Sequence, residues 1–195
     1  MLVRPPLVVL IAGPNGAGKS TTAPRLLRGA LAVSEFVNAD TLALGLSAFR
    51  PDSVSLAAGR VMLERLHALA ATRVDFAFET TLASRSFAPW LLHLRQTGFR
   101  SHLAFLSLSS PDLAVARVEE RVRQGGHHVD EETVRRRFMS GLRNFFTVYQ
   151  DLVDSWQMLD NADMRGLHLV ATRQTGAKLA ILDAPRWRNL REMGG

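Results

Sequence analysis

The chain has 195 residues, of which 47% are apolar and 22% are charged, and its net charge is +6. This composition is typical of a folded globular domain and excludes a disordered or fibrous chain. The absence of cysteine excludes disulfides and thiolate metal sites and leads us to expect a cytoplasmic protein. No apolar run is long enough to span a bilayer, so we expect no membrane partner.

The positive charge comes almost entirely from arginine, because only two of the 24 basic residues are lysines. A positive chain often binds a polyanion, and nucleic acid is one such partner. The arginines form no long tract, however, and several lie between residues 117 and 143 among acidic residues. Such a cluster suits a compact anion such as a triphosphate equally well, so charge alone does not lead us to expect nucleic acid.

The first predicted element is a buried strand over 7–12, followed at once by Gly-Pro-Asn-Gly-Ala-Gly-Lys-Ser and a helical pattern over 19–31. This is the phosphate-binding pattern G-x-x-x-x-G-K-[ST] between a strand and a helix, as its function requires. The glycines let backbone amides point at phosphate oxygens, and the helix N-terminus adds its positive dipole. We therefore expect ATP to bind at Gly13, Asn15, Gly16, Ala17, Gly18, Lys19, Ser20 and Thr21.

Two acidic residues follow the next predicted strands. A short extended stretch over 35–38 leads to Asp40, and a helix over about 54–71, capped by Ser53, leads to a strand over 75–79 that ends in Glu79. Ligands gather at the carboxyl ends of parallel strands, where a carboxylate can take a proton from an attacking hydroxyl or hold Mg²⁺. The alternatives are a helix cap for Asp40 and a strand-end turn for Glu79.

Further strands and helices alternate through the rest of the chain. We expect a helix over 89–96 closed by Gly98, a helix that starts at Ser110-Pro111-Asp112, and a second one from about 130 into the 140s. The remaining apolar runs predict strands over 103–108, 156–159, 167–171 and 179–182, before an arginine-rich C-terminus that we expect to fray. This alternation predicts an α/β fold, a P-loop NTPase three-layer sandwich with a mainly parallel sheet in one domain over 1–195.

Two of these helices, joined by a glycine-rich turn over 125–128, are predicted to form an arginine-bearing lid over about 117–143. An arginine that closes over the phosphates contributes about 10³-fold or more to phosphoryl transfer. At least half of the arginines are expected to form a solvated, ion-paired face instead. We expect no metal at His127-His128, because adjacent side chains diverge. The candidate arginines on the two helices are Arg117, Arg121 and Arg123 on the first, and Arg135, Arg136 and Arg137 on the second.

Missing motifs narrow the class of phosphate-loop protein. A transport-type ATPase would need a Leu-Ser-Gly-Gly-Gln signature and a strand that ends in Asp-Glu, and the chain has neither. A GTPase would need Asn-Lys-x-Asp, which is also absent, and ring-forming motor ATPases generally use a longer chain. The branch that remains is that of compact small-molecule kinases, phosphotransferases that close a lid over ATP.

In its ordered set of short segments, the chain resembles the zeta-toxin family of phosphate-loop kinases. It is most similar to the short bacterial branch that is often labelled predicted ABC-type ATPase. The resemblance covers about residues 7–161. It rests on Gly-Pro-Asn-Gly-Ala-Gly-Lys-Ser-Thr-Thr (13–22), Phe-Val-Asn-Ala-Asp (36–40), Ala-Gly-Arg (58–60), Phe-Glu-Thr-Thr-Leu (78–82), Arg-Val-x-x-Arg-Val-x-x-Gly-Gly-His (117–127), Arg-Arg-Phe (136–138) and Asp-Asn (160–161).

This resemblance implies a kinase that uses ATP and Mg²⁺ to phosphorylate a sugar hydroxyl of a nucleotide sugar such as UDP-N-acetylglucosamine. It also implies the toxin of a toxin–antitoxin pair, in which a small antitoxin covers the ATP site. The chain is shorter than the typical toxins of the family, and its lid sequence differs from theirs.

The resemblance further assigns roles to single residues. Lys19 and Ser20 hold phosphates and Mg²⁺, Asp40 is the general base and a metal ligand, and Glu79 orients the substrate or the metal. Arg121 and either Arg136 or Arg137 clamp the phosphates, and Asn161 lies near the nucleotide base.

Two other functions fit the same motifs. A nucleic-acid-linked ATPase is suggested by the arginine excess, and its ATPase activity would rise with added DNA or RNA. A non-catalytic nucleotide-binding partner protein is the other alternative, against which the intact Lys19, Asp40 and Glu79 argue.

Overall fold

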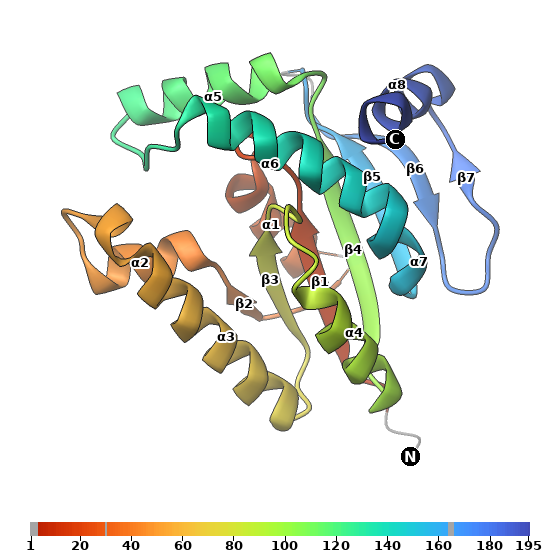
Figure 1. The fold of residues 1–195 in the computed structure, drawn as a ribbon. Coiled ribbons are helices and arrows are strands. Elements are labelled where there is room, and N and C mark those ends of the chain that lie inside the picture. Colours follow the sequence, from red (N-terminus) through yellow and green to blue (C-terminus); the bar gives the residue numbers. More distant parts are fainter. Residues whose placement is uncertain (1–3, 30, 164–165) are drawn as a thin grey trace.

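A seven-stranded sheet forms the centre of the fold, with strand order β2-β3-β1-β4-β5-β6-β7. The computed structural model describes residues 4–29, 31–163 and 166–195. Five strands run parallel, and the last two extend the sheet in antiparallel fashion, so the predicted mainly parallel sheet is confirmed (Figure 1). The strands are β1 Leu7–Ala12, β2 Glu35–Val37, β3 Phe76–Thr80, β4 Arg100–Ser107, β5 Ser155–Asp160, β6 His168–Arg173 and β7 Ala180–Ile181.

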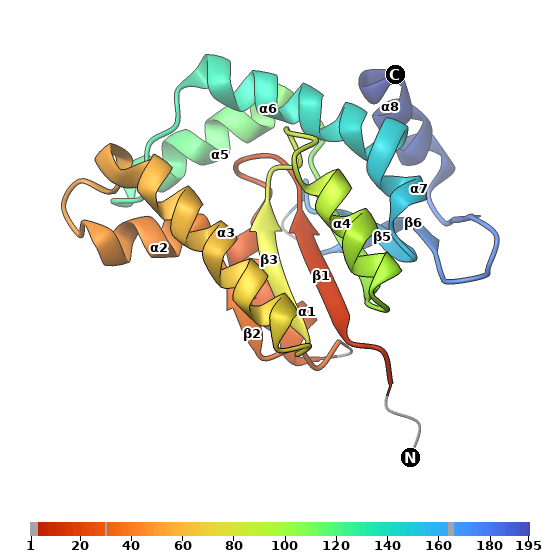
Figure 2. The same cartoon turned by 60° about the horizontal axis from the view of Figure 1, so that its bottom comes forward.

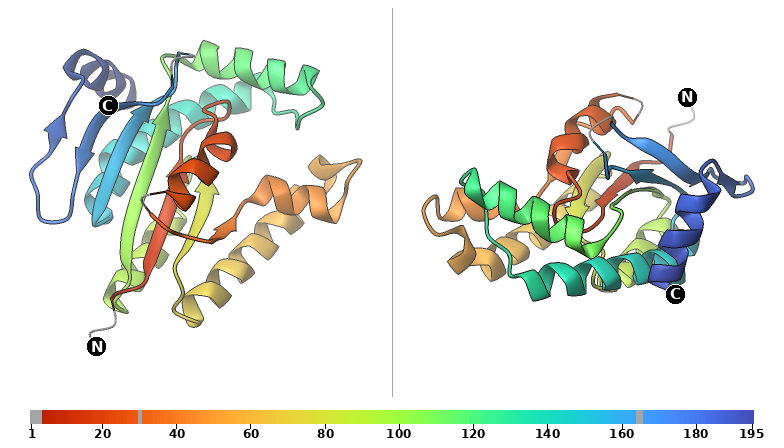
Figure 3. Two further views of the ribbon diagram at one scale, coloured as in Figure 1. Left: turned by 180° about the vertical axis from the view of Figure 1, so that it is seen from behind. Right: turned by 90° about the horizontal axis from the view of Figure 1, so that it is seen from above.

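Helices cover both faces of this sheet and complete the three predicted layers. Helix α1 lies on one face, seen from behind in Figure 3, while α3, α4 and α6 lie on the other (Figure 1). A π-helical segment, Phe145–Tyr149, continues α6 into the short α7. The helices are α1 Lys19–Arg28, α2 Ala39–Leu46, α3 Ser55–Ala71, α4 Phe87–Gln96, α5 Pro111–Arg123, α6 Glu131–Asn144, α7 Gln150–Leu152 and α8 Ala184–Gly194.

The central strands explain why one end of the sheet gathers the predicted site residues. β1 and β4 are apolar runs buried along almost their whole length, as expected for parallel strands covered on both faces. β1 lies between β3 and β4, with Ala12 beside Thr80 and Phe105. The carboxyl ends of these strands therefore meet at one edge, where the phosphate loop follows β1.

Helix α2 was not predicted, and it changes the setting of Asp40. Asn38 caps this helix, because its Oδ1 accepts hydrogen bonds from the backbone amides of Asp40 (2.8 Å) and Thr41 (3.2 Å). Asp40 therefore lies in the first helical turn. The predicted cap Ser53 is also wrong: α3 begins after Val54, and the Ser53 hydroxyl donates to the carbonyl of Arg50 (2.7 Å).

The C-terminus is ordered, contrary to the expected fraying. Helix α8 buries Trp187 and Leu190, and the Trp187 ring stacks on Trp156 with centroids 5.8 Å apart and planes 5° apart. Apolar burial of this extent offsets the cost of ordering the helix. The first helix ends earlier than predicted, at Arg28 rather than Leu31, and the predicted helical residue Ala30 lies outside the described residues.

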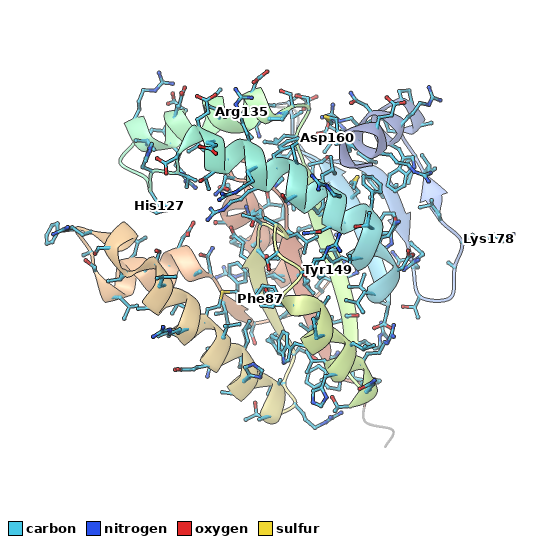
Figure 4. All side chains as sticks on the ribbon, viewed as in Figure 1. Phe87, His127, Arg135, Tyr149, Asp160 and Lys178 are labelled. Carbon is cyan, nitrogen blue, oxygen red and sulfur yellow. The ribbon has the colours of Figure 1, made fainter. Side chains whose placement is uncertain are left out.

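Two hairpins extend beyond the end of the sheet that carries the phosphate loop. The α5–α6 pair and the α2–α3 pair lie on the same side in Figure 2, and Figure 4 shows His127 on the part of the α5–α6 loop that faces α2. In the part of the chain that the structure describes, no helix combines the length and apolar character that a bilayer span needs.

Candidate phosphate-binding site

The phosphate loop adopts a conformation that its glycines make accessible. Gly13 has a φ of 138°, and a Cβ there would lie 2.2 Å from the carbonyl oxygen of Leu106. Gly18 has a φ of 75°, and its Cβ would lie 2.7 Å from Nδ2 of Asn161. Larger residues at these two positions would be strained and would collide with neighbours. The amide of Ala17 donates to the carbonyl of Pro14 (3.2 Å), which closes the turn before α1.

Lys19 begins α1 and is buried in the site, with only 7% of its side chain exposed. Its Nζ donates to the carbonyl of Pro14 (2.9 Å) and lies 3.7 Å from Oε1 of Glu79. Burial is the largest influence on the pKa of Lys19 and lowers it. The charge of Arg121 lowers the pKa further, whereas the charges of Glu79 and Asp40 oppose the shift. Asp40 and Arg121 therefore act electrostatically on the same ammonium group.

Glu79 joins the phosphate loop to two neighbouring strands. Its Oε2 accepts hydrogen bonds from the Ser20 hydroxyl (2.8 Å) and from Nδ2 of Asn38 (2.7 Å). The same Asn38 amide group lies 3.3 Å from the Ser20 hydroxyl oxygen. Asn38 was not predicted as a site residue, although its position directly after β2 is the signal that would have identified it.

Hydroxyl and carboxylate oxygens at this position fit a magnesium ion. Mg²⁺ usually binds one or two carboxylates together with substrate phosphates and water, rather than a dedicated protein cage. Ser20 and the carboxylates of Glu79 and Asp40 offer such oxygens near Lys19. The residues that the structure describes contain no group of three or more histidine, aspartate or glutamate side chains suited to a metal.

Arg121 has a donor that the protein leaves unused. Its Nη2 donates to the carbonyl of His127 (2.7 Å), which holds the guanidinium against the α5–α6 loop. Its Nε is buried and has no hydrogen-bond partner within the described residues. A buried N–H without a partner costs about 1–3 kcal/mol, so a bound acceptor such as a phosphate oxygen would stabilise this arrangement.

The other five candidate arginines of α5 and α6 divide into two groups. Arg117, Arg123 and Arg135 are used within the protein: Arg135, for example, pairs with Glu131 on its own helix and with Asp112 on α5. Figure 4 shows where Arg135 lies. Arg136 is exposed and Arg137 is half-buried, and neither makes a hydrogen bond or ion pair with any described residue. Of the six arginines, Arg123 and Arg135 form the expected exposed ion pairs, whereas Arg117 binds backbone carbonyls instead.

Asn161 follows β5 and forms a hydrogen bond with the phosphate loop. Its Nδ2 donates to the carbonyl of Ala17 (2.9 Å), and its own carbonyl accepts from Nη1 of Arg117 (2.7 Å). The adjacent carbonyl of Ala162 accepts from Nη2 of Arg117 (3.0 Å). Because its side chain is engaged in this way, Asn161 acts on the loop itself, and a contact with the nucleotide base stays a prediction. Thr21, by contrast, is exposed in α1.

Known structures share this arrangement of strands and helices. A complex of AvrRxo1-ORF1 and AvrRxo1-ORF2 with ATP contains a chain that is 14% identical, with a TM-score of 0.76 over 97% of this chain. This chain spans 64% of the length of that protein. The PezAT toxin–antitoxin system of Streptococcus pneumoniae gives 14% identity and a TM-score of 0.62 over 97% of this chain and 86% of its own. At these identities the likeness establishes the P-loop NTPase fold.

Sequence comparison extends the relationship. An uncharacterised protein of Haemophilus influenzae is 28% identical over 132 residues, which cover 67% of this chain and 91% of the relative. The sequence model of the AAA domain family (AAA_33) matches residues 8–146, which include the phosphate loop, Glu79 and helices α5 and α6. The chain belongs to this AAA domain family.

Proposed function

We propose that the chain is an ATP-dependent kinase of zeta-toxin type, which transfers the γ-phosphate to a sugar hydroxyl of a nucleotide sugar. The observation that carries the proposal is the cluster around Lys19. A buried ammonium, a carboxylate bonded to the Ser20 hydroxyl, and an arginine with an unused buried donor all lie at the end of the sheet that bears the phosphate loop. Such a site is organised around a polyphosphate.

Each group has a distinct part in the proposed reaction. The amides of the phosphate loop and Lys19 hold the outer phosphates of ATP, and Lys19 exchanges its contact with the carbonyl of Pro14 for phosphate oxygens. Asp40, exposed in the first turn of α2, accepts the proton of the attacking hydroxyl. Arg121 and Arg137 offset the negative charge that spreads over the transferred group.

Magnesium would be held by Ser20 together with Asp40, and it supplies neutralising charge to the phosphates when bound. Glu79 keeps Ser20 in place through its hydrogen bond and orients the acceptor or the ion.

The proposed biological setting is a toxin–antitoxin pair, with a small antitoxin protein over the ATP site. Its support is that two of the similar structures are two-component assemblies, AvrRxo1-ORF1 with AvrRxo1-ORF2 and the PezAT toxin–antitoxin system. The name of the AAA domain family does not itself distinguish transfer to an acceptor from hydrolysis of ATP. The acceptor is therefore the part of the proposal that most needs a test.

The direct test is incubation with ATP, Mg²⁺ and a panel of nucleotide sugars, followed by mass spectrometry. We expect one acceptor to gain the mass of a phosphate. Asp40→Asn should lower the rate of this transfer by about 10²–10⁴-fold, the usual contribution of a general base, while the affinity for ADP measured without Mg²⁺ stays unchanged.

Glu64→Gln is the matched control, because Glu64 is an exposed carboxylate on α3. Its transfer rate should equal that of the unmodified protein. Full transfer by Asp40→Asn would remove Asp40 from the role of base. Release of free phosphate that rises with added RNA or DNA, without a labelled acceptor, would favour the nucleic-acid-linked ATPase instead.

A further inference from the structure

Residues 160–162, at the end of β5 and directly after it, connect the phosphate loop, helix α5 and the C-terminal helix. Asn161 holds the carbonyl of Ala17 in the phosphate loop, and its backbone amide donates to the carbonyl of Ser107 at the end of β4 (3.0 Å). Arg117 binds the carbonyls of Asn161 and Ala162 from helix α5. The position of this short segment therefore sets both the phosphate loop and the base of the predicted lid.

The third connection comes from the C-terminal helix. Nη2 of Arg186 on α8 donates to Oδ1 of Asp160 (2.6 Å), and the two side chains are only 16% and 17% exposed. The same Oδ1 accepts a hydrogen bond from the backbone amide of Ala162 (3.2 Å). Arg186 thus holds the carboxylate of Asp160 in place, and that carboxylate in turn holds the backbone of residues 160–162.

Helix α8 does not depend on this ion pair for its place in the fold. Trp187 stacks on Trp156 and contacts the ring of Phe146 with centroids 5.1 Å apart, and Leu190 is fully buried. The side chain of Asp183 caps the helix by accepting from the amide of Arg186 (3.0 Å). These contacts anchor α8, so the guanidinium of Arg186 is free to serve the segment after β5.

We propose that Arg186 is a positioning residue for the nucleotide, acting from a helix that lies beyond the matched family region of residues 8–146. Without its guanidinium, the half-buried carboxylate of Asp160 loses its cation and turns toward water. The amide of Ala162 then loses its acceptor, and the carbonyls that Arg117 holds shift with it. Asn161 can no longer keep Ala17 in the geometry that presents the loop amides to phosphate. The inference rests on the proposed nucleotide site.

The test is titration of the full chain with ADP by isothermal calorimetry. We expect Arg186→Gln to weaken ADP binding about tenfold, about 1.4 kcal/mol. Arg186→Lys should recover most of the affinity, because an ammonium can still pair with Asp160. Arg188→Gln is the matched control, since Arg188 is an exposed arginine on the same helix, and it should bind ADP within about twofold of the unmodified protein.

A second pair of variants separates positioning from general stability. Leu190→Ala loosens the packing of α8 and leaves the ion pair in place, so it should lower the melting temperature more than Arg186→Gln but change ADP affinity less. If Arg186→Gln does not fold, Asp160→Ala provides the same test, because it removes both the partner of Arg186 and the acceptor of the Ala162 amide. It should then weaken ADP binding severalfold.

The outcomes distinguish this inference from the function on which it rests. If the unmodified protein binds ADP and Arg186→Gln binds it equally well, or if Leu190→Ala weakens binding just as much, the positioning role of Arg186 is wrong and the site stands. If the unmodified protein does not bind ADP, the proposed function fails first and this inference fails with it. ADP binding without any transfer to an acceptor would leave the role of Arg186 intact.

Discussion

Lys19 and Glu79 form a charged pair in a site that excludes most water. The Glu79 side chain is 11% exposed, and the pKa of Lys19 is lowered chiefly because its ammonium is desolvated. A buried pair of this kind contributes little net stability, yet removing one partner leaves the other charge without compensation. The arrangement is therefore better explained by phosphate binding than by folding.

We therefore expect the effects of substituting Lys19 and Glu79 on stability to be strongly coupled. Lys19→Met and Glu79→Gln should each lower the free energy of unfolding, since each leaves the other charged side chain buried without its partner. The double variant should lose less than the sum of the single losses, by about 0.5–3 kcal/mol. Urea unfolding of the four proteins measures this difference, and transfer should be lost in all three variants. Additive losses would show that the two charges do not interact.

At the scale of elements, α6 is packed closely against the loop that follows β3. A Cβ at Gly141 would lie 2.4 Å from the carbonyl oxygen of Thr81. Nδ2 of Asn144 donates to the carbonyl of Leu82 (2.9 Å), a fully buried residue with a φ of 59°. Such strain persists only where the surroundings enforce it, and it gathers at functional sites. This packing fixes the helix that carries Arg137 relative to the strand that carries Glu79.

Gly141→Ala should therefore destabilise the protein by about 1–3 kcal/mol, the usual cost of overpacking. The matched control is Gly59→Ala in α3, where an added Cβ meets no atom within 4 Å. This control should stabilise the protein by about 0.5–1 kcal/mol through helix propensity. Chemical denaturation of both variants measures the two changes in the free energy of unfolding. Equal changes would argue against the close approach of α6 to the loop that follows β3.

A side-chain contact between β4 and β5 predicts that the stability of the protein depends on pH. Nδ1 of His102 lies 2.8 Å from the Ser155 hydroxyl, and burial lowers the pKa of His102 from 6.5 to about 4. Because the folded state disfavours the charged ring, the stability that this residue provides is present above pH 6.5 and is lost as the pH falls toward 4.

We therefore expect the free energy of unfolding to fall by about 2 kcal/mol between pH 7 and pH 5 through His102 alone. Urea unfolding at the two pH values should show this fall in the unmodified protein. His102→Gln, whatever its stability at pH 7, should lack this part of the fall. If the stability of His102→Gln depends on pH as that of the unmodified protein does, a group other than His102 is responsible for the fall.

At the scale of the whole molecule, the phosphate loop and the main strands could be predicted from local patterns, whereas helix α2 and the long-range contacts could not. The phosphate loop could be identified from sequence because its strand, glycines and helix are contiguous. The bonds from Glu79 to Ser20 and Asn38 depend on β3 lying next to β1 and β2, an order that periodicity does not specify. Arg117 and Arg121 look alike in the sequence, but the fold turns Arg117 onto backbone carbonyls and leaves Nε of Arg121 without a partner.

The C-terminal region is the clearest example of a structure that depends on long-range contacts. The composition of residues 184–195 indicates an exposed, charged segment, and its many arginines led to the expectation of fraying. Trp187 and Leu190 fold it onto the sheet, because Trp156 and Phe146, far from them in the sequence, offer an apolar surface. Helix α8 thereby reaches the segment that supports the phosphate loop, a connection that exists only in the assembled fold.

The central claim is that this site moves a phosphate from ATP to a hydroxyl rather than to water. The most direct measurement is ³¹P NMR of ATP, Mg²⁺ and a small-molecule cell extract incubated with the protein. We expect the γ-phosphate signal to decrease while a phosphomonoester signal appears, and Asp40→Asn to prevent both changes. A γ-phosphate recovered only as inorganic phosphate, or not consumed at all, would contradict this claim.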